Sequence, residues 1–285
     1  MIRRCALAAL ALAFMSASLS AQESKPQRIV SLNLCTDQVL IDLVPASRIR
    51  ALSHVAADAS VSSIVERARS FTRVRGEAEE VLALDPDLVI TTEFSTPSTI
   101  SLLERLGLRV LKVPFASDIA GVRDVVHRIA EAVGEVATGN AVIGKLDKRL
   151  ATLAASARTG PAPTAVIYQV NSIVSAAGTL EDEALRFASF RNLATELHLD
   201  PGGRVALESI VANPPDLLVL SGPSDEYRTV VADTLAHPAL KSVMRDRATL
   251  VVPWRHWLCG TPYIADAIEA LEEARRRLAP RRPPA

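Results

Sequence analysis

The sequence predicts an α/β protein with two lobes, each built on a parallel β-sheet, joined by a long helical connection. Short runs rich in Val, Ile and Leu recur between helix-like stretches, a helix–Pro-Asp–strand pattern occurs once in each half, and a helical stripe separates the halves. Buried strands that alternate with helices are typical of parallel sheets covered on both faces. The composition agrees, because 49% of the residues are hydrophobic and only 4% are aromatic.

The first 21 residues have the order of an export signal. Arg3 and Arg4 precede an apolar run from Cys5 to Phe14, and small residues follow up to Ala21. The run is shorter than the about 20 residues that a membrane-spanning helix needs. Because a charged stretch follows at once, we interpret residues 1–21 as a cleaved signal peptide. The alternative is an uncleaved anchor or a buried first helix.

The charge of the remaining chain is balanced. Residues 1–21 hold two of the 32 Lys and Arg residues and none of the 32 Asp and Glu residues, which leaves 30 basic and 32 acidic residues. This balance argues against nucleic acid as a partner, since such binding rests on neutralising phosphates. No later stretch has 18 uninterrupted apolar residues, so we expect a soluble mature protein.

Six apolar runs are predicted as buried strands, because each is short, rich in Val, Ile and Leu, and bounded by helix-like stretches. They are residues 28–32, 88–92, 110–113, 165–169, 217–220 and 250–252. Two of them share a lead-in, in which a short helix ends at Pro86-Asp87 or at Pro215-Asp216 directly before the strand. Proline stops the helix and aspartate tolerates the turn. The recurrence predicts two lobes of related design, although this pattern is common enough to recur by chance.

A long helical region lies between the lobes. Asp118 is placed to cap its start, and apolar residues recur at helical spacing from Ile119 to Val133. Gly134 is a weak point, after which a helix continues to about Ala157. The predicted organisation is a signal peptide over 1–21, an N-terminal lobe over 26–117, a connecting helical region over 118–158 and a C-terminal lobe over 163–279.

Residues 28–38, 76–90 and 216–223, together with the connecting helix, resemble the helical-backbone (class III) periplasmic solute-binding proteins of ABC importers. That family binds cobalamin, ferric siderophores or haem. The resemblance implies two Rossmann-like lobes, one long connecting helix and a ligand cleft between the lobes. It also implies a periplasmic, non-enzymatic protein that captures a metal chelate and delivers it to an ABC permease dimer in the inner membrane, with its cytoplasmic ATPase. We expect a monomer.

Two glutamates are candidates for contact with the permease. In the family, one surface glutamate on each lobe pairs with permease arginines, and the matching positions here are Glu79 and Glu208. Carboxylates on rigid helices suit bidentate pairing with Arg. The alternative is an ordinary solvated glutamate, which is also favoured in the first turn of a helix.

Ligands of open parallel sheets bind at the carboxyl ends of the strands. Both tryptophans of the chain fall within residues 254–257, and indole faces suit flat or bulky apolar ligands. Arg255 is suited to an anionic group. The alternative is that Trp254 or Trp257 packs in the core. The candidate ligand-binding residues are Cys35, Thr36, Asp37, His54, Glu93, Phe94 and Phe115 in the first lobe, and Tyr168, Gln169, Ser221, Trp254, Arg255, Trp257 and Cys259 in the second.

Cys35 follows the first predicted strand and Cys259 follows the last. Three interpretations stay open: independent small core residues, a disulfide that ties the lobes together, or joint action on a metal or ligand. The family usually carries Ser or Pro in the loop after its first strand, so this departure leaves the identity of the ligand open.

Other functions lack their motifs. The chain has no GxSxG, GxxxxGK[ST] or GxGxxG, and its histidines show no HxH or HExxH spacing. We therefore predict no catalytic residues, no protein-bound metal and no covalent cofactor. A corrinoid such as cobalamin or a ferric siderophore is the expected ligand, with haem as the alternative. From another class, the alternative is a secreted thiol-dependent enzyme that uses Cys35 or Cys259.

Overall fold

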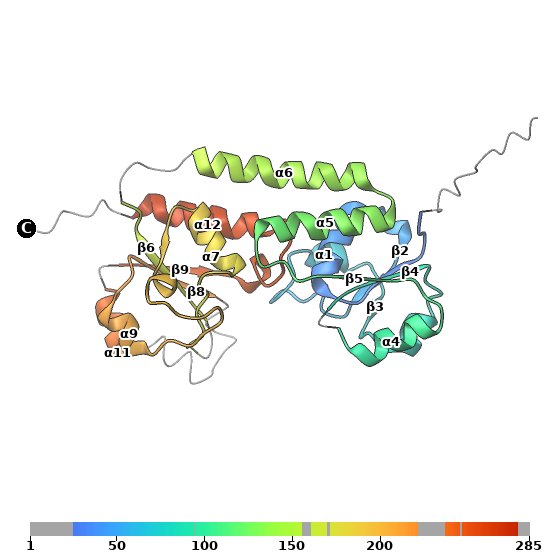
Figure 1. Cartoon of the computed structure of the whole chain (residues 1–285), viewed down its shortest axis with the longest axis horizontal. Coiled ribbons are helices and arrows are strands. Elements are labelled where there is room, and N and C mark those ends of the chain that lie inside the picture. Colours follow the sequence, from blue (N-terminus) through green and yellow to red (C-terminus); the bar gives the residue numbers. More distant parts are fainter. Residues whose placement is uncertain are drawn as a thin grey trace, which may run out of the picture.

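The computed structural model describes residues 25–93, 95–155, 161–169, 172–221, 237–245 and 247–278. Two parallel sheets stand side by side, and a layer of helices covers both of them on one side (Figure 1). Every pairing between the strands of these sheets is parallel. The predicted α/β fold with two lobes is confirmed. The predicted signal peptide lies outside the described residues.

The N-terminal lobe is built on a five-stranded sheet. Its elements are β1 (Ile29–Ser31), α1 (Leu34–Leu43), η1 (Ala46–Arg48), β2 (Ile49–Ser53), α2 (Val65–Ala68), β3 (Arg73–Val74), α3 (Ala78–Leu82), β4 (Leu88–Thr92), α4 (Pro97–Arg105) and β5 (Val110–Val113). The strand order is β3-β2-β1-β4-β5. The order reverses at β1, which lies between β2 and β4, and this is the place where doubly wound sheets bind ligands.

Two helices make up the connecting region, α5 (Ile119–Val133) and α6 (Val136–Ala155). Asp118 caps α5 as predicted, since its Oδ1 accepts a hydrogen bond from the backbone N of Gly121 at 2.6 Å. Gly134 ends α5 in a left-handed conformation with φ of 72°, which a residue with a Cβ rarely adopts. The chain folds back there, so α6 alone runs above both lobes (Figure 1).

The C-terminal lobe is built on a four-stranded sheet. Its elements are β6 (Thr164–Tyr168), α7 (Leu180–Phe187), β7 (Arg191–Asn192), α8 (Leu193–Glu196), α9 (Leu207–Ala212), β8 (Leu217–Ser221), α11 (Pro238–Val243), β9 (Ala248–Val252), η3 (Trp254–His256) and α12 (Ile264–Arg277). The strand order is β7-β6-β8-β9. The six predicted strands are all present. The prediction missed β2, which Arg50 interrupts with a charge, and the two-residue strands β3 and β7.

The repeated Pro-Asp turn has the same structural role in both lobes. Asp87, before β4, accepts hydrogen bonds from the backbone N atoms of Gln27 (2.8 Å) and Arg28 (2.9 Å), at the start of β1. Asp216, before β8, accepts one from the backbone N of Thr164 (2.8 Å), at the start of β6. In each lobe the aspartate therefore fastens the amino end of the neighbouring strand. This shared detail supports the prediction of two lobes of related design.

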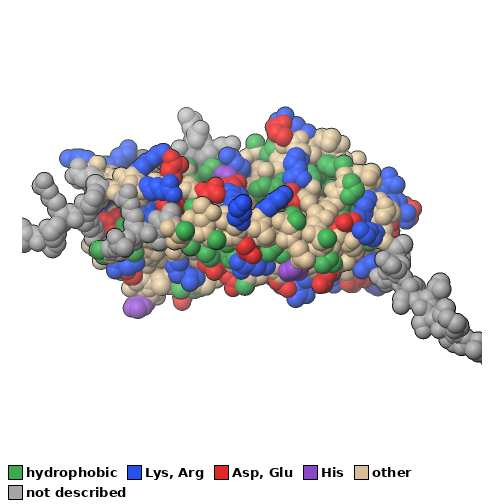
Figure 2. Space-filling model, turned by 90° about the horizontal axis from the view of Figure 1, so that it is seen from above, with side chains coloured by type: hydrophobic (Ala, Val, Ile, Leu, Met, Phe, Trp, Pro, Cys, Tyr) green, Lys and Arg blue, Asp and Glu red, His purple; other side chains and the backbone are tan. Residues whose placement is uncertain are grey.

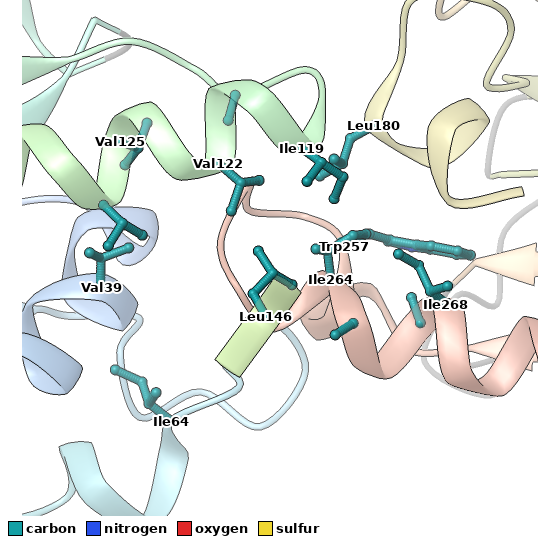
Figure 3. Close-up of a cluster of buried hydrophobic side chains, with 14 of the residues drawn as sticks. Val39, Ile64, Ile119, Val122, Val125, Leu146, Leu180, Trp257, Ile264 and Ile268 are labelled. Atoms are coloured by element: carbon teal, nitrogen blue, oxygen red, sulfur yellow. The ribbon is translucent and has the colours of Figure 1, made fainter. Parts of the chain in front are cut away.

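One hydrophobic core cluster extends from one lobe into the other (Figure 3), and a smaller cluster lies within each lobe. The larger cluster includes strand residues of both sheets, such as Ile29 of β1 and Ile167 of β6. Helices α5, α6 and α12 fill the space between them. The core residues at this junction include Ile119 and Val122 of α5, Leu146 of α6, Leu180 of α7, and Trp257, Ile264 and Ile268 around α12. The lobes are therefore packed together rather than joined by a flexible linker.

Candidate ligand-binding site

The predicted ligand-binding residues follow the carboxyl ends of the strands. In the N-terminal lobe, Cys35 comes after β1, His54 after β2 and Phe115 after β5. In the C-terminal lobe, Gln169 comes after β6 and Trp254 after β9. Because parallel strands all end at one edge of their sheet, each lobe gathers its candidates at a single edge.

The turn between β1 and α1 is shaped by a run of polar residues. Asn33 is the N-cap of α1, and its Oδ1 accepts a hydrogen bond from the backbone N of Cys35 at 2.9 Å. The Thr36 hydroxyl donates to the Asn33 carbonyl at 2.8 Å and lies 2.7 Å from the Ser31 hydroxyl. Cys35 is left partly exposed and Thr36 is fully buried. Thr36 therefore supports the turn, which corrects its prediction as a ligand contact.

Asp37 is also buried. Its carboxylate accepts hydrogen bonds from the backbone N (3.1 Å) and the hydroxyl (2.5 Å) of Ser53. Burial raises the pKa of Asp37 to about 7, because desolvation outweighs these hydrogen bonds. The side chain ties α1 to the end of β2 and has no exposed surface for a ligand. We therefore correct the prediction that Asp37 contacts the ligand.

Cys35 and Cys259 form a disulfide between the two lobes. The S–S distance is 2.16 Å and the Cα atoms are 5.1 Å apart, across a sequence separation of 224 residues. Of the three interpretations that the sequence left open, the structure shows this one. Neither sulfur is a free thiolate while the bond is intact, so neither is available as a nucleophile or as a metal ligand. The disulfide joins the first turn of α1, directly after β1, to the segment between η3 and α12 of the other lobe.

Three predicted contacts of the C-terminal lobe lie in its core. Trp257 is 3% exposed, and its Nε1 donates a hydrogen bond to the Ser221 hydroxyl at 2.9 Å. Tyr168 is 1% exposed and its hydroxyl pairs with that of Ser172 at 2.9 Å. A buried indole or phenol needs such a partner for its polar atom. These side chains have no exposed face for a ligand, and Trp257 follows the core-packing alternative.

Seven candidates are accessible from solvent. Glu93 and Phe115 are exposed, and the Glu93 carboxylate accepts a hydrogen bond from the backbone N of Phe115 at 3.2 Å, which joins the loops after β4 and β5. Gln169 donates to the Ser175 hydroxyl at 3.0 Å. Phe94 lies outside the described residues. The accessible candidates are Cys35, His54, Glu93 and Phe115 from one lobe, and Gln169, Trp254 and Arg255 from the other.

Glu79 and Glu208 occupy equivalent places in the two lobes. Both are exposed and lie in the first turn of a short helix, α3 and α9 respectively. Helix α3 packs against α4, and α9 packs against α11. These helices lie on the side of the sheets opposite α6 (Figure 1). The two carboxylates therefore belong to the face of the molecule that is remote from the helical layer.

A groove on the other side of the molecule was not predicted. This groove, of about 590 Å³, lies between α6 and α12 and is lined by Lys145, Lys148, Arg149, Thr152, Leu153 and Glu269. Lys148 and Arg149 follow Lys145 by three and four residues, so the sequence could have predicted that they share one face of a helix with it. Arg149 is already paired with Asp266 (2.6 Å) and Glu269 (2.7 Å). Over this face, Lys and Arg side chains are interspersed with Asp and Glu (Figure 2).

Two polar contacts between the lobes were also missed. The Thr261 hydroxyl donates to Gln38 Oε1 at 2.9 Å, and the Tyr263 hydroxyl donates to Asp42 Oδ2 at 3.2 Å. The partners are 223 and 221 residues apart in the sequence. No local pattern signals such a pair, because only the packing of the lobes brings α1 and the start of α12 together.

Comparison with known proteins decides the family. Residues 29–244 match the family model described as periplasmic binding protein, which covers most of the chain. The chain belongs to the periplasmic binding protein family. Its fold is shared by a periplasmic haem-binding protein from Pseudomonas aeruginosa, with 25% identity, a TM-score of 0.70 and coverage of 90% of this chain and 95% of that one.

Two further relatives of this periplasmic binding protein are similar. The vitamin B12-binding protein of Vibrio cholerae has 17% identity and a TM-score of 0.67, over 88% of this chain and 97% of that one. A curated cobalamin-binding protein from Halobacterium salinarum is 27% identical over 231 residues. The alignment covers 79% of this chain but 61% of that relative, so the chain spans under two thirds of its length.

Two kinds of feature are not found among the described residues of this periplasmic binding protein. No helix among them has both the length and the apolar character to cross a bilayer. Within the same residues, no three His, Cys, Asp or Glu side chains come together as a set that could hold a metal ion. The accessible candidates are instead aromatic, amide and charged side chains at the edges of two sheets.

Proposed function

We propose that this protein is the substrate-binding component of an ABC importer, and that it captures a metal chelate between its two lobes. The observation that carries the proposal is the position of the accessible candidates, which line the adjoining carboxyl edges of two sheets in a member of the periplasmic binding protein family. Binding is non-covalent and no bond of the ligand is broken. The shared core and the inter-lobe disulfide keep any closure of the lobes small.

The proposed ligand is a corrinoid such as cobalamin, or a ferric siderophore. The curated relative with 27% identity is a cobalamin-binding protein, which favours a corrinoid. Trp254 and Phe115 offer aromatic surface from opposite lobes, which suits a large flat ligand. Arg255, next to Trp254, offers a cation for an acidic group of the chelate. Haem is the second candidate, because the haem-binding structure shares 25% identity.

Delivery requires a surface that recognises the permease. Glu79 and Glu208 are proposed to pair with arginines of a permease dimer in the inner membrane, one glutamate on each half. Their equivalent places on the two lobes, on the face opposite α6, support this role (Figure 1). A two-fold symmetric partner would present two like surfaces to two like lobes. The cytoplasmic ATPase of the importer then drives transport, and the binding protein acts as a monomer.

The proposed location is the periplasm. Residues 1–21 would direct export and then be removed, because they combine a basic start, an apolar run and small residues before Ala21. An oxidising compartment would also permit the Cys35–Cys259 disulfide to persist. Fractionation of cells that express the full chain tests the periplasmic location. Mass determination of the product tests the removal of residues 1–21.

A titration tests the ligand. The protein from residue 22 onward is mixed with cyanocobalamin, a ferric hydroxamate or haemin, and tryptophan fluorescence is followed. Trp254 is partly exposed and Trp257 is buried, and a coloured chelate bound near them should quench both, because energy transfer does not require contact. Saturable quenching by one chelate supports the proposal. The Trp254→Phe variant should lose the part of the quenching that comes from Trp254 and keep the absorbance change of the bound chelate.

Two controls sharpen the titration. N-acetyltryptophanamide corrects for absorption of the exciting light by the coloured chelates. Each ligand is also recovered from the complex unchanged, which separates binding from turnover. Absence of saturable binding for all three chelates, in oxidised protein of correct mass, would overturn the proposed ligand class.

A further inference from the structure

One short segment of the C-terminal lobe lies directly on the N-terminal lobe. This bridging segment, residues 255–263, leads from η3 into α12. Its partners are three residues of α1, one residue before α2 and one residue after β5. The five contacts are Arg255 with Ser63, Cys259 with Cys35, Gly260 with Ala116, Thr261 with Gln38 and Tyr263 with Asp42.

These contacts are closely packed and largely shielded from water. Thr261 and Gln38 are each 1% exposed, and the hydrogen bond between them is therefore buried. Gly260 approaches Ala116 so closely that a Cβ on Gly260 would lie 2.5 Å from the Ala116 Cβ and carbonyl oxygen. Only glycine allows the two backbones to come this close. The bridging segment therefore packs on the N-terminal lobe in one defined position.

The bridging segment lies next to accessible ligand candidates of both lobes. It begins at Arg255, directly after Trp254. On the N-terminal lobe it is bonded to Cys35 and packed on Ala116, the neighbour of Phe115. A displacement of the segment would thus change the distance between the aromatic residues that the two lobes contribute. Helix α6 spans both lobes in the helical layer and is a separate connection between them (Figure 1).

We propose that the bridging segment sets the spacing between the two ligand-facing edges, and that the Cys35–Cys259 disulfide makes this spacing, and with it ligand affinity, sensitive to redox conditions. The inference rests on the proposed function. Oxidised protein holds the edges at fixed spacing and keeps the chelate bound. In reduced protein the two sulfurs are no longer bonded, the segment moves more freely and the chelate leaves faster.

The reaction that would change the state is thiol–disulfide exchange with a dithiol. Cys35 is partly exposed whereas Cys259 is 2% exposed, so an incoming thiolate reaches the Cys35 sulfur. Its attack forms a mixed disulfide with Cys35 and breaks the bond to Cys259, which leaves as a thiolate and takes up a proton. The second thiol of the reductant then releases Cys35 as a thiol. The dithiol is oxidised to a disulfide, and the protein gains two electrons and two protons.

Hydrogen exchange tests the segment without any ligand. The backbone N–H groups of His256, Leu258 and Thr261 donate to carbonyls of residues 253–259. Treatment with a dithiol at a temperature well below unfolding should raise the exchange of residues 255–263 about tenfold more than that of the α6 amides, whose exchange reports the general loss of stability. The Cys35→Ser/Cys259→Ser variant should exchange like the reduced protein and should not respond to the dithiol. Unchanged protection of residues 255–263 on reduction would overturn the proposal.

Ligand release provides the second measurement. For the chelate that binds in the titration, its dissociation rate from oxidised and reduced protein is measured by competition. Reduction should speed release about tenfold, and Gly260→Ala should do the same without a change of redox state. Gly139→Ala overpacks the contact between α6 and α5 and involves none of the five contacts of the segment, so it should lower stability but leave release unchanged.

Two outcomes separate this proposal from general destabilisation and from the proposed function. If Gly139→Ala speeds release as much as Gly260→Ala does, release follows overall stability and the proposal fails. If none of the three chelates binds oxidised protein, the proposed function fails. Hydrogen exchange, which needs no ligand, then tests by itself whether reduction loosens the bridging segment. Equal protection of residues 255–263 in both redox states would overturn the proposal.

Discussion

Gly139 of α6 lies against Ala130 of α5, and a Cβ on Gly139 would come within 2.6 Å of the Ala130 Cβ. The two helices of the connecting region fold back on each other at Gly134, so their close approach depends on one position without a side chain. Side-chain atoms of Leu43 and Val126 lie close by, both 3.9 Å from where that Cβ would be. Gly139 therefore belongs to the core that both lobes share.

Gly139→Ala should destabilise the protein. The added methyl group overpacks the contact with Ala130, for which a loss of about 1–3 kcal/mol in the free energy of unfolding is typical. Gly144→Ala is the matched control, because Gly144 is on the same helix and a Cβ there would have no atom within 4 Å. It should stabilise by up to about 1 kcal/mol through helix propensity. Urea unfolding measures both, and equal shifts of the two variants would contradict the close packing.

Reduction of the disulfide should lower the stability of the protein strongly. The bond closes a loop across 224 residues, which restricts the unfolded chain. The chain-entropy relation gives about 5 kcal/mol for a loop of this length. Urea unfolding with and without a dithiol measures the loss. The Cys35→Ser/Cys259→Ser variant should show the reduced value in both conditions, and a dithiol effect on that variant would point to another cause.

Asp37→Asn should change the pH dependence of stability. Burial raises the pKa of Asp37 from its ordinary value of 3.8 to about 7. Between these two pH values the carboxyl group loses its proton in the unfolded chain and keeps it in the folded protein. The contribution of Asp37 to the free energy of unfolding therefore falls as the pH rises from about 4 to 7 and then stays constant. Asparagine does not titrate, so the variant lacks this loss. The free energy of unfolding of Asp37→Asn, relative to that of the natural protein, should therefore rise by about 4 kcal/mol between pH 4 and pH 8.

Asp58→Asn is the control for this series. Asp58 is exposed, and hydrogen bonds from the hydroxyl and the backbone N of Ser60 lower its pKa. A carboxyl group with a lowered pKa contributes stability at neutral pH that is lost as the pH falls. The free energy of unfolding of Asp58→Asn, relative to that of the natural protein, should therefore fall as the pH rises, opposite to Asp37→Asn. Thermal or urea unfolding from about pH 2 to 8 gives both curves, with the Asp58 difference confined to pH values below about 4 and the Asp37 difference above it. Parallel curves for the natural protein and Asp37→Asn would contradict the raised pKa.

Glu79→Arg combined with Glu208→Arg should abolish uptake of the chelate in cells and leave its affinity for the purified protein unchanged. Both residues are exposed and lie in helices that carry none of the ligand candidates, and reversed charges would repel permease arginines. Glu131→Arg, an exposed position on α5 in the helical layer, is the matched control and should transport normally. Equal loss of affinity in the double variant would show that these residues belong to the ligand site instead.

The secondary structure was largely predictable from local patterns. The six apolar runs became strands, Asp118 became the cap of α5, and Gly134 ended that helix. Each of these features depends on residues only a few positions apart. The prediction missed β3 and β7, because two residues are too few to show a pattern, and the last two residues of its connecting helix, 156 and 157, lie outside the described residues.

The candidate site was predictable only in outline. The order of strands and loops placed its residues at the carboxyl edges, but it could not say which side chains face outward. Thr36 and Asp37 fall in the first turn of α1, Tyr168 ends β6 and Trp257 follows η3, and all four are buried. Their exposure depends on partners such as Ser53 and Ser221, which other strands supply.

By itself, the sequence determined the class of fold, the strands of the two sheets and the loops that follow their carboxyl ends, because hydrophobic periodicity and Pro-Asp turns are local properties of the chain. The tertiary structure alone decided that Cys35 and Cys259 are bonded, that Gly260 is seated on Ala116 and that Trp254 rather than Trp257 is accessible. Each of these facts depends on groups brought together from distant parts of the chain. Only the packing of both lobes into one core fixes those distances.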